Sequence, residues 1–134
     1  MRIKMEHLLM NLQKKLGDNF LNVDITAYVD KLLANAKIVS IMNGEELEAF
    51  IAFYDNDEKM ETAFITQLAV GAEHWGKSYG EILMETTTKI LKKAGFKYIE
   101  ARYISNYPVS LKFAQMYGFE LIKKNDIEIL RKVL

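Results

Sequence analysis

The stretch Trp75-Gly76-Lys77-Ser78-Tyr79-Gly80 lies between an apolar segment that ends at Val70 and a helical pattern that begins at Gly80. Backbone N–H groups at a helix start point toward one spot, and the helix dipole favours an anion there. Gly76 and Gly80 let the backbone approach a ligand closely, and Lys77 adds a positive charge. The stretch therefore predicts a phosphate-binding loop, although an ordinary strand–helix connection also explains two glycines.

Two other phosphate-binding motifs fit the surrounding sequence poorly. Gly76-Lys77-Ser78 fits the end of a Walker A loop, but we interpret Gly71 as one residue out of place for its first glycine. The segments after residue 80 also do not continue the parallel α/β series to which such a loop belongs. A dinucleotide-binding fingerprint needs three glycines in a fixed spacing, which this loop lacks.

The composition describes an ordinary globular chain with balanced charge. Its 134 residues carry 18 basic and 18 acidic side chains, which argues against general attraction to nucleic acid. No linker or repeat divides the sequence, so we expect a single domain over residues 1–134. The absence of cysteine excludes disulfides and thiolate metal sites, and His7 and His74 show no ligand-like spacing, so no metal site is expected.

The ends and the apolar runs of the chain bear on its location. The first residues, Met1 to His7, lack the apolar core of a signal peptide. No apolar run approaches the roughly 20 residues that span a bilayer. We therefore expect a cytoplasmic protein without a membrane partner. The sequence leaves a homodimer open.

Apolar periodicity predicts two helices in the first part of the chain, over residues 5–16 and 25–36. Gly17 is a natural stop for the first, and Asp24 is suited to cap the second.

Three strands are expected next, over residues 38–42, 47–54 and 60–70. Asn43-Gly44 predicts a type I′ hairpin, because both central residues of that turn need positive φ. The segment 47–54 is apolar on both faces and predicts a central strand.

The second part of the chain alternates helices and strands. A helix is expected over residues 80–94, with an apolar side made of Ile82, Leu83, Thr86, Ile90, Leu91 and Ala94. A strand, a short helix and two strands follow, over residues 98–104, 108–117, 119–122 and 127–134. The whole order, ααβββαβαββ, predicts an α/β fold with one mixed, mostly antiparallel sheet flanked by helices.

The loop, its helix, the next strand and the segment 107–119 together resemble the GNAT superfamily of N-acetyltransferases. In that family a loop of the form Q/R-x-x-G-x-G/A binds the coenzyme A pyrophosphate. Here Gly80 matches the last position, whereas Trp75 and Ser78 replace residues that the pattern requires.

A second family pattern, N-x-x-A-x-x-x-Y-x-x-x-G-F, is matched at Ser110, a small residue in place of alanine, and at Gly118-Phe119. Asn106 lies one place early, so the segment carries an extra residue or Tyr107 replaces the family asparagine. The resemblance extends over about residues 37–122.

The resemblance implies a GNAT-like fold with a V-shaped sheet that holds an acyl-CoA thioester, with acetyl-CoA as the donor. Backbone groups of Leu68 and Val70 would pair with the pantetheine arm, and an N–H near Val70 would stabilise the oxyanion. The residues implied in coenzyme binding are Leu68, Val70, Trp75, Gly76, Lys77, Ser78, Tyr79, Gly80, Asn106 and Phe113.

Three residues near this site have alternative interpretations. Trp75 would stack on the ligand or pack on the next helix. Asn106 would bond the pantetheine or cap the helix at Pro108, and these roles are compatible. The loop position of His74 suggests an exposed side chain or a neighbour of the ligand phosphate.

The catalytic residues are less clear from the sequence. In many relatives a tyrosine four residues before the Gly-Phe pair protonates the leaving thiolate, and here that position is Ala114. Tyr103, near a strand end, is the candidate replacement. Tyr117 points about 60° away on the same helix and is interpreted as a core residue. Gln67 and Thr66 face the acyl site in one interpretation, but neither is a good base.

We therefore expect an acyl-CoA-dependent N-acyltransferase that transfers acetyl to an amine of a small molecule or a protein. The alternative is a catalytically weak or inactive module that binds coenzyme A or a partner, and Ala114 supports it. Acceptor specificity is expected in the first two helices and in the strand 98–104.

Overall fold

The computed structural model describes residues 1–17, 20–103 and 108–134. The predicted order of helices and strands is confirmed, with an unpredicted 3₁₀ turn, η1 (Ala72–His74), before the third helix. The helices are α1 (Arg2–Leu16), α2 (Ile25–Asn35), α3 (Tyr79–Ala94) and α4 (Pro108–Met116). The strands are β1 (Lys37–Asn43), β2 (Glu46–Tyr54), β3 (Thr62–Val70), β4 (Tyr98–Arg102), β5 (Phe119–Lys124) and β6 (Ile127–Val133).

The six strands form one sheet in the order β1-β2-β3-β4-β6-β5. Every neighbouring pair is antiparallel except β3 and β4, which are parallel. This confirms the predicted mixed, mostly antiparallel sheet. The prediction of a central strand for residues 47–54 is also confirmed, because β2 lies between β1 and β3 and is buried on both faces.

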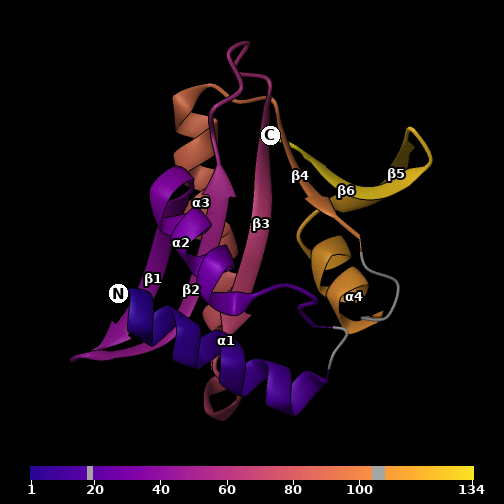
Figure 1. The fold of residues 1–134 in the computed structure, drawn as a ribbon. Coiled ribbons are helices and arrows are strands. Elements are labelled where there is room, and N and C mark those ends of the chain that lie inside the picture. Colours follow the sequence, from indigo (N-terminus) through magenta and orange to yellow (C-terminus); the bar gives the residue numbers. More distant parts are fainter. Residues whose placement is uncertain (18–19, 104–107) are drawn as a thin grey trace.

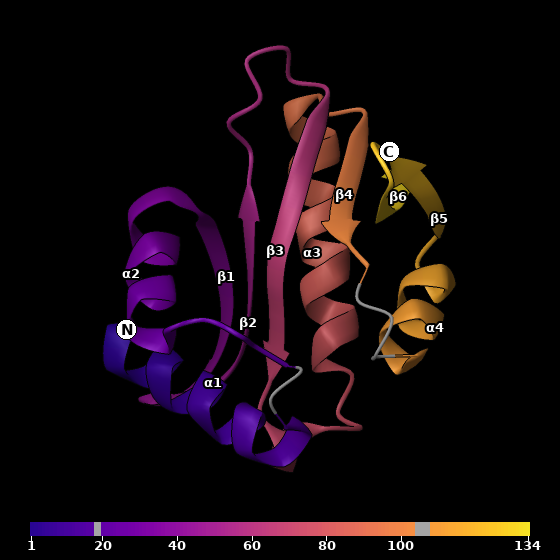
Figure 2. The same ribbon diagram turned by 45° about the vertical axis from the view of Figure 1, so that its right-hand side comes forward.

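Helices cover both faces of the sheet, as Figures 1 and 2 show. Residues of α1 and α2 pack on Phe50 and Ala52 of β2 and on Ala69 of β3. Residues of α3 and α4 pack on the opposite face, against Ile51 and Phe53. Two apolar cores therefore hold the sheet between the helix pairs. Within the described parts of the chain, no helix has the length and apolar character needed to cross a membrane.

Local signals predict the helix ends well and one hairpin less well. The Asp24 side chain accepts a hydrogen bond from Ala27 N–H at 3.3 Å, which confirms the predicted N-cap of α2. The predicted type I′ turn at Asn43-Gly44 is wrong, because Asn43 pairs with Glu46 and the loop is Gly44-Glu45. Of the loop residues only Gly44 has positive φ, which fits a turn with glycine at the first central position.

The apolar side predicted for α3 is rotated from the one that the structure buries. Leu83, Met84, Thr87 and Leu91 face the sheet. Ile82 and Ile90, both predicted on the buried side, are 48% and 44% exposed. The loop before α3 fixes the rotation of the helix, so apolar residues flanking the buried stripe remain at its exposed margins.

The parallel pair β3–β4 separates halfway along β3. Pairing runs only from Thr62 with Tyr98 to Ile65 with Ala101. Beyond that point β3 continues to Val70 while β4 ends, and Figure 2 shows β4 stopping well before the end of β3. The register of β3 with β2 also shifts here, so that Thr66 is an extra residue in a β-bulge. The last five residues of β3, Thr66 to Val70, therefore have a free edge.

Candidate functional site

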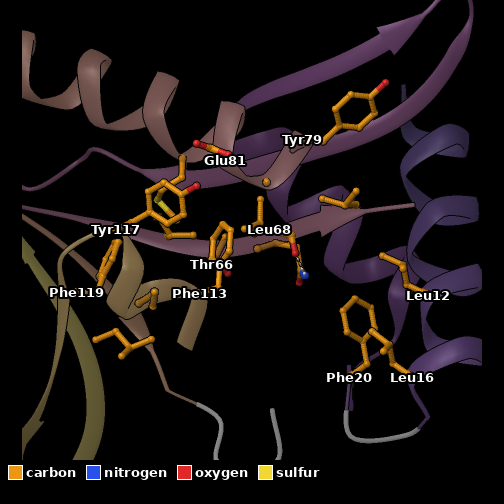
Figure 3. A pocket seen from close by; sticks show the side chains of 18 of the residues that line it. Leu12, Leu16, Phe20, Thr66, Leu68, Tyr79, Glu81, Phe113, Tyr117 and Phe119 are labelled. Atoms are coloured by element: carbon orange, nitrogen blue, oxygen red, sulfur yellow. Dashed lines mark hydrogen bonds between the residues drawn. The ribbon is translucent and has the colours of Figure 1, made fainter. Parts of the chain in front are cut away.

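A cavity of about 1320 Å³ opens beside the free edge of β3. Its walls come from the C-terminal part of α1 and the segment before α2, from β3, from the loop before α3, and from α4. Figure 3 shows Leu12, Leu16 and Phe20 at one end, Phe113, Tyr117 and Phe119 at the other, and Thr66 and Leu68 between them. The separated strands thus create one continuous space that reaches both faces of the sheet.

Backbone carbonyls along the free edge of β3 accept hydrogen bonds from side chains instead of a strand. Tyr28 Oη donates toward Thr66 O at 3.3 Å, and Gln67 Nε2 donates to Leu68 O at 3.4 Å. Trp75 Nε1 donates to Val70 O at 2.8 Å. Three alternate residues of one strand therefore present their polar groups to the cavity, where an extended ligand can pair with them.

The loop before α3 has the geometry of an anion site. Ser78 is the N-cap residue of α3 and has left-handed dihedrals, with φ of 64°, at the position where the family pattern has glycine. Ile82 N–H bonds Ser78 O at 3.0 Å, so the N–H groups of residues 79–81 precede the first intrahelical bond. Residues 79–81 line the cavity, so their N–H groups are placed at its wall. The sequence-based prediction that these groups bind an anion stays a prediction.

Gly80 allows a close approach that a side chain would disturb. A Cβ atom built there would lie 3.3 Å from Phe113 Cζ and 4.0 Å from Leu68 Cδ2. The loop, β3 and α4 therefore converge at Gly80, and a ligand on the helix N-terminus would lie beside the Phe113 ring.

The interpretation of Gly71 as one residue out of place is wrong, because residues 71–78 match the letters of a Walker A loop: a glycine, four residues and then Gly-Lys-Ser. The structure does not give these residues the geometry of a Walker A loop. The Lys77 ammonium lies 3.2 Å from His74 Nδ1, and η1 occupies the middle of the motif. The preceding strand, β3, pairs antiparallel with β2. The sequence argument against a Walker A loop, from the missing parallel series, is thus supported by the sheet.

His74 belongs to a buried polar network below the loop, and the prediction of an exposed side chain is wrong, because it is only 8% exposed. Its Nε2 lies 3.1 Å from Glu48 Oε2, and Tyr79 Oη donates to the other Glu48 oxygen at 2.8 Å. Since an ammonium can only donate, the Lys77 contact makes Nδ1 the acceptor and places the imidazole proton on Nε2, toward Glu48. The network fixes η1 and the first residue of α3.

Glu46, Glu48 and His74 place three potential metal ligands within 4.8 Å of one another, the only such group among the residues that the structure describes. A metal would need the lone pair of His74 Nε2. The proton assigned there by Lys77 points at Glu48 instead, so the present arrangement is that of a hydrogen-bond network.

The α4 wall holds the position where relatives carry their acid. Ala114 is 7% exposed and lines the cavity beside Phe113 and Tyr117. The Phe113 and Tyr117 rings lie 4.8 Å apart. Burial, and then the carboxylates of Glu81 and Glu85, raises the pKa of Tyr117, so its phenol stays protonated at neutral pH. Figure 3 shows Glu81 on the same side of the cavity as Tyr117.

The structure brings together most of the predicted coenzyme-binding residues. The cavity is lined by Leu68, Val70, Trp75, Gly76, Ser78, Tyr79, Gly80 and Phe113. Lys77 is not among the lining residues, and Asn106 lies outside the described residues. Trp75 is 47% exposed, and its indole N–H donates to Val70 O. Its stacking on a ligand and its packing on the next helix both stay predictions.

Tyr103 lines a second, smaller pocket of about 220 Å³ with Arg102 and Asp126, and it is not among the described residues around the large cavity. Its assignment as the acid stays a prediction.

Sequence reasoning missed Tyr28 and the apolar residues before α2. Tyr28 is a polar-tipped aromatic within the apolar stripe of α2, and such a side chain usually brings its hydroxyl to a buried partner. That signal was present, but the partner on β3 is 38 residues away and no local pattern indicates it.

The fold therefore combines a cavity, a free strand edge along one wall and a helix N-terminus at the end of that edge. Comparison with protein-family models matches residues 10–119 to the acetyltransferase (GNAT) family. The chain belongs to this family, which confirms the resemblance drawn from the loop and the Gly118-Phe119 helix end. A search of curated protein sequences found no match.

Solved structures share the fold at low sequence identity. An acetyltransferase from Streptococcus agalactiae is 16% identical with a TM-score of 0.84, over 99% of this chain and 91% of that one. The PaiA N-acetyltransferase of Thermoplasma acidophilum, in complex with coenzyme A, is 16% identical with a TM-score of 0.79, over 99% and 92%. A GNAT acetyltransferase of Elizabethkingia anophelis with acetyl-CoA bound is 19% identical with a TM-score of 0.67, over 81% and 82%.

Proposed function

We propose that this chain is an acyl-CoA-dependent N-acyltransferase, with acetyl-CoA as the donor and an amine of a small molecule or a protein as the acceptor. The observation that carries the proposal is the continuity of one cavity from the N-terminus of α3 along the free edge of β3. Family membership and the coenzyme-bound relatives support the same ligand.

Each part of the ligand has a matching part of the wall. The pyrophosphate takes the N–H groups at the start of α3, with Gly76, Ser78 and Gly80 around it. The pantetheine amides pair with the edge of β3 at Leu68 and Val70 and replace the Trp75 contact with Val70 O. The Leu68 carbonyl has two lone pairs, so it keeps its contact with Gln67. The thioester then lies near the β-bulge at Thr66, where both ends of the cavity meet.

In the proposed reaction, the acyl thioester and the acceptor amine enter from opposite ends of the cavity and react where they meet. The amine nitrogen attacks the thioester carbonyl, the C–N bond forms, and the C–S bond breaks as the thiolate leaves. The ammonium proton leaves through a base or water, and a proton returns to the thiolate. The sequence-based prediction of an oxyanion-binding N–H near Val70 does not fit a thioester at Thr66, because the two residues lie four positions apart along β3; a backbone N–H close to the bulge takes that role in the proposed complex. Tyr103 is the acid predicted from the sequence, and Tyr117 is a second phenol that lines the cavity itself.

The first test is calorimetric titration with coenzyme A, combined with thiol release from acetyl-CoA over a panel of amines. Binding with turnover supports the enzyme. Tight binding without turnover on any amine supports the inactive module that Ala114 suggests. No heat and no thermal shift at millimolar coenzyme A would overturn both.

Ala114 also gives a direct test of the missing acid. Ala114→Tyr restores a phenol at a position that already lines the cavity, and Ala114→Phe adds the same bulk without the hydroxyl. We expect the tyrosine variant to turn over faster than the phenylalanine variant. Equal rates would show that an acid at this position contributes nothing in this chain.

A further inference from the structure

The hydroxyl of Tyr28 lies at the junction between the two ends of the cavity, among oxygen atoms. Its Oη is 3.3 Å from Thr66 O, 3.2 Å from Thr66 Oγ1 and 3.2 Å from Gln67 Oε1. All of these residues line the cavity. The group stands beside the β-bulge, where the proposed thioester lies.

This cluster has more acceptors than protons. Gln67 Nε2 faces the carbonyl of Leu68, which can only accept, so Gln67 Oε1 is the atom turned to Tyr28. The single hydroxyl proton of Tyr28 cannot satisfy both Gln67 Oε1 and Thr66 O. The contacts are also longer than the usual 2.7–2.8 Å of an O–H···O bond. A ligand that brings several N–H donors would complete the cluster.

The cavity wall beside this cluster is apolar. It consists of Leu12, Leu16, Phe20, Leu21 and Val23. Apart from tyrosines, the described residues that line the cavity include only three with ionisable side chains: His74, Glu81 and Arg102. The single carboxylate among them, Glu81, lies on the same side of the cavity as Tyr117. No carboxylate therefore lies at the Leu12–Val23 end of the cavity within the described chain.

We propose that the acceptor is a primary amine on a single apolar skeleton, aliphatic or aromatic, and not a polyamine or a lysine within a charged peptide. The inference rests on the proposed function and names its substrate class. The amine nitrogen takes Thr66 O, Gln67 Oε1 and Tyr28 Oη, and the carbon skeleton fills the apolar end. A second ammonium would have to enter that apolar end without a carboxylate partner among the described lining residues, which is strongly unfavourable.

A neutral acceptor cluster also helps the chemistry. Three oxygens orient the amine nitrogen, but none carries a full negative charge that would hold the ammonium form. Because burial disfavours the charged form of an amine, the site lowers the pKa of the bound acceptor. The acceptor then loses its proton more readily before it attacks the thioester.

The experiment measures kcat/KM with acetyl-CoA for 2-phenylethylamine and hexylamine against spermidine, 1,6-diaminohexane and a lysine peptide. We expect the two apolar monoamines to be preferred at least about tenfold. Tyr28→Phe and Gln67→Leu should each raise KM for the monoamines about 2- to 10-fold, the usual effect of one lost hydrogen bond. Their affinity for coenzyme A should stay unchanged. Tyr98→Phe, a tyrosine on β4 away from the cavity lining, is the matched control.

Gln67→Glu tests the inference in the opposite direction, because it should improve the substrates that the native site disfavours. It adds a carboxylate to the cluster and should shift preference toward the diamine. Turnover that favours spermidine or the peptide in the native chain overturns the inference and leaves the proposed function intact. If no amine turns over, binding of 2-phenylethylamine to the coenzyme A complex, followed by Trp75 fluorescence or calorimetry, decides instead, and no binding overturns the inference. Failure to bind coenzyme A overturns the proposed function itself.

Discussion

Replacing Gly80 with aspartate separates what the loop does for the fold from what it does for a ligand. Gly80 is the second residue of α3, where a negative charge is favourable to the helix dipole by about 0.3–1 kcal/mol. A side chain there also meets the Phe113 ring, because a Cβ atom would lie 3.3 Å from Phe113 Cζ. The ring has to yield by a few tenths of an ångström. These two effects oppose each other, so we expect the free protein to change stability by less than about 1 kcal/mol.

The effect on coenzyme A should be larger and of one sign. Two like charges about 5 Å apart repel by about 1 kcal/mol in water and by about 3 kcal/mol at the effective dielectric of a protein surface. Since 1.4 kcal/mol is a factor of ten, Gly80→Asp should weaken binding roughly fivefold to a hundredfold. The assay is calorimetric titration with coenzyme A, with chemical denaturation of the same variant as the fold check.

Two controls isolate the charge. Gly80→Asn has nearly the same size without the charge, and Gly80→Ala has only the Cβ atom. The difference between the Asn and Asp affinities should shrink as salt rises to about 0.5 M, because the Debye length then shortens to a few ångströms. Equal affinities for Asp and Asn at low salt would refute the idea that phosphate lies at this helix start.

The remaining predictions use other parts of the molecule. Trp75 is the only tryptophan, and its fluorescence should change on coenzyme A binding because the pantetheine displaces it from Val70 O; an unchanged spectrum at saturation would contradict that displacement. Ser78→Gly should raise the free energy of unfolding by up to about 1 kcal/mol, measured by urea denaturation, because glycine tolerates left-handed dihedrals. Glu100→Gln should lower it by roughly 2–4 kcal/mol at pH 7, because it leaves Arg131 without its buried carboxylate. Burial alone would raise the pKa of Glu100, but hydrogen bonds from Arg131 and Lys124 lower it below the ordinary value. The stabilisation by Glu100 should therefore be fully present above the ordinary glutamate pKa. It should disappear as pH falls through the lowered pKa of the folded protein.

Local sequence signals predict local structure here and fail where distant parts decide. Asp24 and Gly17 mark helix ends because capping depends on a few neighbouring atoms. The hairpin loop was predicted one residue early because Asn-Gly favours a type I′ turn, whereas the pairing of Asn43 with Glu46 places Gly44 at the first central position. Ile82 looked like a core residue because periodicity gives the spacing of a stripe, while packing selects its centre.

The same difference between local signals and distant contacts applies to the residues of the candidate site. The anion loop is contiguous in sequence, so Gly76, Ser78 and Gly80 were found from their spacing and line the cavity. His74 was misplaced because its burial depends on Glu48, a bulged residue on another strand. Tyr28 was missed because it meets β3 only after the sheet has formed. Residues that act through tertiary contacts leave little local trace.

The absence of the usual tyrosine at position 114 is a smaller obstacle to catalysis than it first suggests. A thiol of ordinary pKa, about 8.5, is only about 1.5 units from neutral pH, so a leaving thiolate without an acid costs about 2 kcal/mol. An amine of pKa about 10.4 must give up its proton against a gap of about 3.4 units, or roughly 4.6 kcal/mol. The larger free-energy cost is therefore the deprotonation of the acceptor amine. In this chain Tyr28, Thr66 and Gln67 lie beside an apolar wall, where desolvation lowers the pKa of the amine and so reduces that cost. A site arranged to prepare the amine has little reason to exist in a module that only holds coenzyme A, and for that reason we favour the enzyme.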